Sequence, residues 1–558
     1  MCGISGIVGS LATQENMEAM TTAQEHRGVD HIGHKVQKKK YALGHNRLSI
    51  IDLHANAHQP FLSQNKRYSL VFNGEIYNYV EIKNELEKEA INFETSSDTE
   101  VLLQAYIHWG EKSLDKFNGM FAFAVFDHKN DTLFLARDRF GVKPLYYTTT
   151  RGNLIFASEI KAILPFINKK VNKKVLANYL AYGSYGLPEE TFFENIHQLP
   201  GGYKATFDKQ NLTISKWYHF VSRVKTLVKE NQQIDWVTAK EKYKEILEDS
   251  LKLRFRADVP VGFNLSGGVD SSLLLALVNQ RKDAHQVEAF TFYTGDDRYD
   301  ELYWVEKMVE LTKTNLNKVK FEANDFKKWH EHISHIQDEP YGGLPTLAYA
   351  KLFQTASNHN IKVLLDGQGM DEAWAGYDYY QNNSQHTIQG QKENVSPFKT
   401  DCLQPLLSNC QEKPDYPKPF ESNLLNKQYR DLFYTKIPRA LRFNDRISMA
   451  ATTELREPFL DYRLVEFAFS LPDKYKIRNG EGKFMLREML NEYNAGEVAF
   501  APKRPLQTPQ REWLAHELSD DVDEAINKLK NGDNKYIKTE LVKNYWEEYK
   551  NGSRLTSF

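Results

Sequence analysis

The sequence predicts an α+β sandwich followed by an α/β unit, a doubly wound parallel sheet with a helical C-terminal part. Strand-like segments dominate the first 208 or so residues, whereas strands alternate with helices after them. The length of 558 residues also exceeds the roughly 250 to 300 residues that one hydrophobic core usually serves. We therefore expect two large domains.

The first part of the chain contains short apolar runs bounded by turn residues. Residues 68–72, 120–126 and 133–136 are separated by Asn, Gly and Asp, which is typical of strands. Residues 97–106 predict a helix, because a serine can cap the start and the apolar side chains form a stripe. A mixture of this kind favours a sandwich with helices on it.

In the second part of the chain, strand-like and helix-like hydrophobic patterns alternate. Residues 221–238 are mostly polar without a clear period, and we expect the domain boundary in their vicinity. Beyond about residue 425 the pattern is mostly helical. The expected strands between these segments are 259–265, 287–293 and 361–365, and the expected helices are 239–253, 271–279 and 303–311.

Composition and charge exclude several classes of protein. The chain has 72 basic and 74 acidic residues and no basic block beyond residues 38–40, so nucleic-acid binding is not expected. No apolar stretch reaches the roughly 18 residues that a membrane span needs, and the N-terminus lacks a signal-peptide pattern. Three cysteines, Cys2, Cys402 and Cys410, make neither a disulfide framework nor a metal cluster. We expect a cytoplasmic protein without a membrane partner.

Cys2 is a candidate nucleophile. Removal of Met1 would leave its amine free, and an α-amino group with a pKa near 8 can act as the base for the thiol. A cysteine near a terminus is more often incidental, but glycines alternate here with apolar residues, as in a strand that approaches other backbone closely. We therefore expect a buried, ordered terminus.

Four segments in order resemble the class II N-terminal-nucleophile glutamine amidotransferases, and the resemblance spans about the first 200 residues. It implies that Cys2 attacks the side-chain amide of glutamine, forming a thioester and releasing ammonia, and that Asn73 and Gly74 form the oxyanion hole. The segments are Cys2-Gly3-Ile4, Arg47-Leu48-Ser49-Ile50, Asn73-Gly74-Glu75-Ile76-Tyr77-Asn78 and Ser97-Asp98-Thr99-Glu100.

The same resemblance implies how the glutamine is held. Arg47 would bind the α-carboxylate of glutamine through a bidentate pair, and Glu75 and Asp98 would bind its ammonium group. Each residue alone would more often be a surface charge or part of a turn. The ordered set together with Cys2 carries the prediction.

A phosphate-binding site is predicted in the small polar loop between the expected strand 259–265 and the expected helix 271–279. Glycines let the backbone approach phosphate closely, and the N–H groups of the following helix and the serine hydroxyls can donate to it. The loop lacks the Gly-Lys-Ser/Thr end of a Walker loop and resembles the SGGxDS motif of PP-loop ATP pyrophosphatases, which adenylate a carboxylate. A plain strand-to-helix turn is the alternative for a lone Gly-Gly. The resemblance implies that ATP binds at Leu265, Ser266, Gly267, Gly268, Asp270, Ser271, Ser272, Asp366 and Gly367.

A second loop follows the expected strand 361–365. Because the carboxyl ends of parallel strands lie at one edge of a sheet, we expect this loop to lie beside the phosphate loop. By resemblance, Asp270 and Asp371 would hold Mg²⁺. Asparagine synthetases usually have a glutamate, thought to act as a base toward ammonia, at the position of Gln368. Glutamine cannot accept a proton, so either a carboxylate such as Glu372 substitutes, or Gln368 only orients ammonia, or the acceptor is not aspartate.

Further family features follow along the chain. Residues 441–449 and 454–461 resemble helical segments that line the synthetase site, with Pro458 ending a helix. Lys503 matches a lysine that the family uses against the phosphates, and Met120 resembles a residue that lines an internal ammonia passage.

The two resemblances together identify the chain as similar to the glutamine-hydrolysing asparagine synthetases. Residues 1–208 would be the glutaminase domain and 209–558 the ATP-binding synthetase domain, with L-glutamine, L-aspartate, ATP and Mg²⁺ as substrates and cofactor. The products would be asparagine, glutamate, AMP and pyrophosphate, and a homodimer is a family expectation. The alternatives are the same chemistry on another carboxylate acceptor, as in the β-lactam synthetases, and a nucleotide-binding protein without catalysis.

Overall fold

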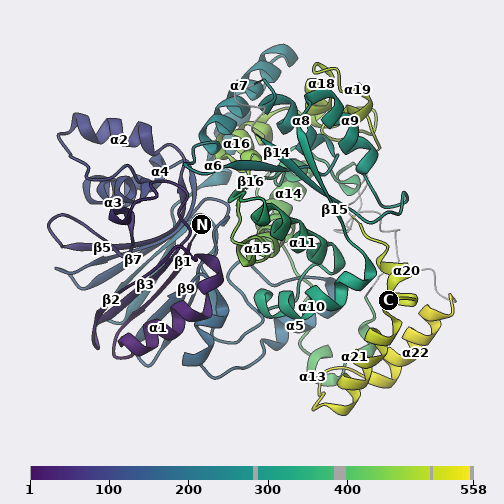
Figure 1. Ribbon diagram of the computed structural model, residues 1–558, viewed down its shortest axis with the longest axis horizontal. Helices are drawn as coiled ribbons and strands as arrows, with labels where there is room; N and C mark the ends of the chain where they lie inside the picture. Colours follow the sequence, from purple (N-terminus) through teal and green to yellow (C-terminus); the bar gives the residue numbers. More distant parts are fainter. Residues whose placement is uncertain (1, 281–286, 382–397, 503–506, 553–558) are drawn as a thin grey trace.

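The computed structural model describes residues 2–280, 287–381, 398–502 and 507–552. A β-sandwich forms the first part of the chain and an α/β unit with many helices forms the second (Figure 1). The start of the chain lies where the two parts meet, whereas the C-terminal helices lie at the far end of the second part (Figure 1).

Two six-stranded antiparallel sheets make the sandwich. Their strand orders are β10-β8-β9-β1-β3-β2 and β12-β11-β7-β6-β5-β4. The first sheet comprises β1 (Gly3–Val8), β2 (His31–Gln37), β3 (Tyr41–Arg47), β8 (Tyr146–Thr150), β9 (Asn153–Ala157) and β10 (His197–Gln198). The second comprises β4 (Phe61–Leu62), β5 (Tyr68–Ile76), β6 (Gly119–Asp127), β7 (Thr132–Arg137), β11 (Tyr203–Asp208) and β12 (Asn211–Lys216).

Side-chain alternation along these strands builds three apolar layers. Ile4 on β1 packs with Val71 on β5 in the core between the sheets, because alternate residues of a strand point to the same face. Ile7 points the other way and packs under α1 (Gln14–Ala23), while Phe72 packs under α3 (Asp98–Trp109). The predicted α+β sandwich, its strands and its helix from residue 97 are confirmed.

The second part is built on a five-stranded parallel sheet. Its strand order is β15-β14-β13-β16-β17, and every neighbouring pair is parallel. The strands are β13 (Val261–Asn264), β14 (Glu288–Tyr293), β15 (Asn315–Lys320), β16 (Val363–Leu365) and β17 (Glu454–Arg456). The chain direction across the sheet reverses between β13 and β16, so a ligand crevice is expected at their carboxyl ends.

Helices cover both faces of the parallel sheet. On one face α8 (Val269–Val278) and α9 (Leu302–Thr312) pack against it, and on the other α10 (Ala323–Gln337) and α11 (Leu344–Asn358) do so. The predicted doubly wound sheet is confirmed. From α14 (Asn423–Arg430) the rest of the chain is mostly helical, as expected, with α15 (Lys436–Ala450), α16 (Tyr462–Ser470), α18 (Phe484–Asn491), α21 (Ser519–Asn531) and α22 (Thr539–Lys550).

Residues 221–238, which show no clear period in the sequence, are mostly helical. α6 (Phe220–Glu230) and the start of α7 (Trp236–Arg254) occupy most of them. Phe220 and Val224 are buried one turn apart, and Arg223 Nε donates to Glu466 Oε1 on α16 at 2.6 Å. The apolar stripe of α6 is narrow, so this helix depends on packing against α16 for its stability.

The prediction that residues 454–461 are helical is wrong. Its first three residues form β17, which pairs with β16 from Val363↔Glu454 to Leu365↔Arg456. Pro458 begins the 3₁₀ turn η10 (Pro458–Leu460) instead of ending a helix. A strand three residues long is decided by its distant partner, because local periodicity cannot specify it.

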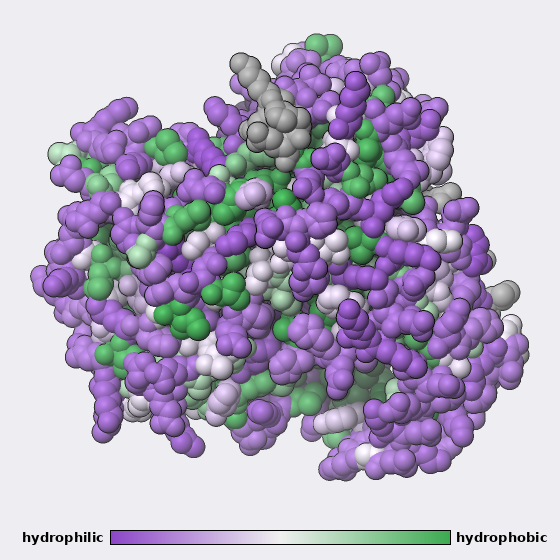
Figure 2. All heavy atoms as spheres, viewed as in Figure 1, coloured by the Kyte–Doolittle hydropathy of each residue, from purple (hydrophilic) through white to green (hydrophobic). Residues whose placement is uncertain are grey.

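Polar side chains cover most of the face shown in Figure 2, with small apolar patches between them. Within the described ranges, no helix is both long enough and apolar enough to cross a membrane.

Candidate active sites

The chain begins inside the sandwich. Cys2 directly precedes the central strand β1, and its side chain is 8% exposed. Its backbone N–H donates to Asn73 Oδ1 at 3.0 Å, and its Sγ lies 3.9 Å from the carbonyl oxygen of Leu48. Burial raises the pKa of the Cys2 thiol, so a nearby base has to generate the reactive thiolate. That the free α-amino group is this base stays a prediction.

Two groups suited to an oxyanion hole lie beside Cys2. Asn73 Nδ2 is buried and, within the described residues, has no hydrogen-bond acceptor. Gly74 has φ +146°, and a Cβ there would lie 2.0 Å from the carbonyl oxygen of Met120 on β6, so only glycine fits. A buried donor without an acceptor is costly unless a ligand supplies one. Substrate oxygen could do so here.

The residues predicted to bind glutamine surround the same place. Arg47 ends β3, and its guanidinium donates to the carbonyl oxygens of His54, at 2.9 Å, and of Asp52. Asp98, the first residue of α3, accepts from the N–H of Ile76 at 2.9 Å. Arg47 and Glu75 both lie near enough to Cys2 to influence its thiol electrostatically.

Both acidic residues of this set have a raised pKa. Burial raises the pKa of Asp98 to about 7. Burial and the neighbouring Asp98 raise the pKa of Glu75 well above its usual range. Glu75 Oε1 also lies 3.7 Å from Arg456 Nη2 on β17, so this carboxylate contacts the synthetase part. An ammonium group between the two carboxylates would relieve their repulsion.

The phosphate loop lies at the carboxyl end of β13, as predicted. Gly267 adopts φ +80° and Val269 begins α8. Ser271 Oγ lies 3.1 Å from both the backbone N and the Oγ of Ser266, so the loop is closed before any ligand binds. Ser272 Oγ is buried, and no partner for it lies in the described part of the chain. Such a turn can hold a pyrophosphate against the start of the helix.

The second loop meets the first across the crevice between β13 and β16. Asn264 Nδ2 donates to Asp366 Oδ1 at 3.3 Å. A Cβ on Gly367 would lie 3.1 Å from the Cβ of Asp270. A pocket opens beside this crevice, and its lining carries aromatic and polar side chains suited to a nucleoside. It is lined by Asn264, Leu265, Ser266, Thr291, Phe292, Tyr299, Asp300, Glu301, Tyr349 and Gln507.

Lys483 was not predicted, and it joins the two loops. Its Nζ pairs with Asp270 and lies 2.6 Å from Asp371 Oδ1. It precedes α18 with φ +60° and is 5% exposed. A Cβ on Gly376 would lie 2.3 Å from Cε of Lys483, so this lysine packs closely against the second loop. The glycines at 480 and 482 before this lysine are the only local signal, and they are weak.

The contacts of Lys483 with Asp270 and Asp371 show whether Mg²⁺ could bind between these two carboxylates. Asp270 and Asp371 reach one ammonium group, so their carboxylates converge on one cation position. In residues 2–280, 287–381, 398–502 and 507–552, no group of three or more metal-binding side chains would hold an ion alone. The two carboxylates therefore fit a metal whose other ligands come from phosphate and water.

The remaining predicted residues fall in different places. Gln368 lies near two carboxyl groups, with its side chain close to Asp366 and its backbone N–H close to Glu457. Glu372 is buried, accepts from Tyr377 Oη at 2.7 Å, and has its pKa raised to about 7, chiefly by burial. Lys503 lies outside the described residues.

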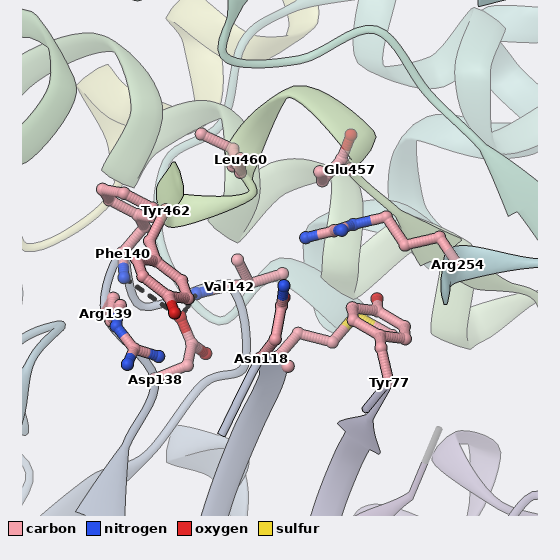
Figure 3. Close-up of a pocket in the computed structure, with 12 residues that line it drawn as sticks. Tyr77, Asn118, Asp138, Arg139, Phe140, Val142, Arg254, Glu457, Leu460 and Tyr462 are labelled. Atoms are coloured by element: carbon pink, nitrogen blue, oxygen red, sulfur yellow. Dashed lines mark hydrogen bonds between the residues drawn. The ribbon is translucent and has the colours of Figure 1, made fainter. Parts of the chain in front are cut away.

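A small cavity lies between the two parts of the molecule. Figure 3 shows Tyr77 and Asn118 projecting into it from the sandwich and Glu457 and Leu460 facing them from the synthetase side. Its volume is about 10 Å³, which is roughly what one water-sized molecule needs. Its lining comprises Tyr77, Asn118, Gly119, Met120, Asp138, Arg139, Phe140, Val142, Arg254, Glu457, Leu460 and Tyr462.

A buried cysteine at the start of a β-sandwich, joined to an α/β unit with a phosphate loop, defines a glutamine-dependent, ATP-using amidotransferase. Comparison with protein families agrees: a glutamine amidotransferase domain matches residues 1–218 and an asparagine synthase domain matches residues 242–557. The chain belongs to the asparagine synthase family.

Several curated relatives match along most of their length. Asparagine synthetase (glutamine-hydrolyzing) 3 of Bacillus subtilis is 30% identical over 90% of this chain and 86% of its own. Asparagine synthetase (glutamine-hydrolyzing) 2 of the same organism is 31% identical, over 90% of this chain and 71% of its own. Amidase chyE of Penicillium rubens is 26% identical over 95% of this chain and 92% of its own.

Proposed function

We propose that the protein makes L-asparagine from L-aspartate and ATP with ammonia released from L-glutamine, forming glutamate, AMP and pyrophosphate. The observation that carries the proposal is that one chain combines a buried Cys2 beside the unpartnered Asn73 Nδ2 with a phosphate loop at the end of β13. The names of the full-length relatives support aspartate as the acceptor.

The glutaminase reaction uses the sandwich. Cys2 Sγ attacks the side-chain amide of glutamine, and Asn73 Nδ2 with the Gly74 N–H stabilises the oxygen that gains charge. Arg47 binds the α-carboxylate, and Asp98 with Glu75 binds the ammonium group. Ammonia leaves the tetrahedral intermediate with a proton from the α-amine of Cys2, and water hydrolyses the thioester.

The synthetase reaction uses the two loops at the switch point. The N–H groups and hydroxyls from Ser266 to Ser272 hold the phosphates, and Lys483 stabilises the charge that develops as pyrophosphate leaves. Asp270 and Asp371 would hold Mg²⁺, which would neutralise phosphate charge. Lys483 then moves from the carboxylates toward the phosphates. Lys503 remains a proposed second cation.

The remaining proposals concern organisation. We propose a glutaminase domain of residues 1–208, a synthetase domain of 209–558, a homodimer, and a cytoplasmic location. Size-exclusion chromatography with light scattering measures the oligomeric state.

The first experiment incubates purified protein with MgATP and glutamine, with and without L-aspartate, and quantifies pyrophosphate and asparagine. Aspartate-dependent pyrophosphate release with an equal amount of asparagine is expected. Cys2→Ala should abolish the glutamine-dependent reaction and retain the ammonia-dependent one, because the two sites are separate. A C2A protein that uses glutamine normally would contradict the role of Cys2.

A second candidate is the same chemistry on another carboxylate acceptor. Gln368 favours it, because the residue differs from the glutamate usual in asparagine synthetases, and a relative named amidase chyE matches the chain nearly end to end. Pyrophosphate release that does not depend on aspartate but appears with another carboxylic acid would select this candidate.

A further inference from the structure

Glu457 is a buried carboxylate at the junction of the two sites. It follows β17 directly, is 4% exposed, and lies near the backbone N–H of Gln368, which influences its carboxyl group. Its Oε2 is buried, and among the residues that the structure describes it has no hydrogen-bond partner. A charged or neutral carboxyl group held this way can accept or donate one proton without disturbing a structural bond.

Glu457 also lines the cavity between the two parts of the molecule. Figure 3 shows its side chain above the opening, on the side opposite Tyr77 and Asn118. Met120 lines the same cavity from the sandwich strand β6. Through Gln368, Glu457 is next to the Asp366 loop at the end of β16. It therefore lies between the cavity and the loop that follows β16.

The charges around Glu457 suit reversible protonation. Asp366 repels a proton-free Glu457, whereas Lys143 on the sandwich side and Arg254 on α7 attract it. Burial, the largest effect, and Asp366 raise the pKa of Glu457 well above its usual range. A carboxylate with a raised pKa is a better base near neutral pH than an exposed one.

The other carboxylates in this region are less available. Glu372 Oε1 is already bonded to Tyr377 Oη at 2.7 Å. Asp366 Oδ1 accepts from the Gly367 N–H at 2.7 Å and from Asn264, whereas its Oδ2, like Glu457 Oε2, has no partner among the described residues. Neither lines the cavity, in contrast to Glu457.

We propose that Glu457 is the catalytic base of amide formation and replaces the carboxylate that Gln368 cannot provide. This inference rests on the proposed function. Ammonia leaves the cavity and its lone pair attacks the carbonyl carbon of the acyl adenylate. The C–N bond forms, the C–O bond to AMP breaks with its electron pair on AMP, and one N–H proton passes to Glu457.

The test separates three activities in Glu457→Gln, a substitution of nearly the same shape. Asparagine formation from saturating ammonia should fall about 100-fold or more, which is typical for loss of a general base. Aspartate-dependent ATP–pyrophosphate exchange and glutamine hydrolysis should stay within about threefold. Glu310→Gln, an exposed glutamate on α9, is the matched control and should change none of the three.

Two further readouts distinguish a base from a structural residue. At a fixed concentration of unprotonated ammonia, the wild-type rate should fall as pH drops below the raised pKa of Glu457, and E457Q should lack this limb. Adding Gln368→Glu to E457Q should restore at least tenfold of the lost rate, because the carboxylate returns to the neighbouring position.

The outcomes are decisive. E457Q that forms asparagine within threefold of wild type, or that loses pyrophosphate exchange in parallel, overturns the role of Glu457. Wild-type protein that forms no asparagine contradicts the proposed function instead. In that case the same comparison is made on the acceptor that the wild type does use.

Discussion

At the residue scale, two buried carboxylates decide how the glutaminase site responds to pH. Asp98 has its pKa raised to about 7 because it is buried, and Glu75 lies close enough to share a ligand with it. A neutral carboxyl group attracts an ammonium group far less than a carboxylate does. Glutamine binding should therefore need the charged form of Asp98.

The prediction concerns kcat/KM for glutamine. It should fall about tenfold per pH unit below pH 7, because protonation of Asp98 removes the charge that binds the substrate. Asp98→Asn should lower it roughly 10- to 100-fold, the range expected for one hydrogen bond to a charged group, and remove that dependence. Steady-state glutamate release across pH measures both.

Asp131→Asn, at an exposed carboxylate of the same domain, is the control and should keep the wild-type profile. A D98N protein with unchanged kcat/KM would show that Glu75 alone holds the ammonium group.

At the element scale, the turn from β13 into α8 depends on backbone geometry at one glycine. Gly267 has φ +80°, and a Cβ there would lie 3.0 Å from the carbonyl oxygen of Glu301. Gly268 has φ −73°, and its nearest contact would be Ser266 Oγ at 3.5 Å. Substitution of Gly267 therefore tests backbone strain, whereas substitution of Gly268 tests how closely the backbone approaches phosphate.

Gly267→Ala should lower the free energy of unfolding by about 1–2 kcal/mol, the cost of left-handed backbone for a residue with a Cβ. It should also raise KM for ATP. Gly268→Ala should leave the free energy of unfolding within about 0.5 kcal/mol of wild type, so any rise in its KM would report close approach of phosphate. Urea denaturation and ATP titration measure these effects, and equal stability of the two variants would contradict the strain.

At the scale of the whole molecule, a buried ion pair joins the glutaminase and synthetase parts. Arg27 donates through Nη1 and Nη2 to the carboxylate of Asp445 on α15, at 2.8 and 3.2 Å, and through Nε to the carbonyl oxygen of Cys2 at 3.1 Å. Cys2 and helix α15 are thus held by one guanidinium. Breaking a buried pair typically costs about 3–5 kcal/mol when one charge is left alone. Arg27 Nη1 also donates to the buried Glu159 at 2.9 Å, so the loss of Asp445 should cost less than that.

Asp445→Asn should therefore loosen the junction. We expect the ratio of glutamate to asparagine to rise above one, since ammonia escapes before it reaches the acceptor. The loss of unfolding free energy should be smaller than that of a fully broken buried pair, because Arg27 keeps Glu159 as a partner. Product quantification and urea denaturation test this. Glu306→Gln, in the exposed pair with Lys318, should change neither, because such pairs contribute about 0–1 kcal/mol.

Local pattern was sufficient for most elements and for the short motifs. The runs at 68–72 and 120–126, the helix from residue 97 and the loop after β13 all depend on neighbours within a few residues. The short strand β17 and helix α6 do not, because β16 and α16 supply the partners that stabilise them. Lys483 was missed for the same reason: its two carboxylates lie far away in sequence.

By itself the sequence determined the α+β sandwich and doubly wound sheet, the buried start of the chain and the phosphate loop, because hydrophobic period, turn glycines and contiguous motifs are local properties. Only the tertiary structure decided that Lys483 joins the two loops, that Arg27 ties Cys2 to α15, and that Glu457 faces both the cavity and Gln368. Those relations arise when distant segments pack and exclude water, and burial then changes what each carboxylate and cation can do.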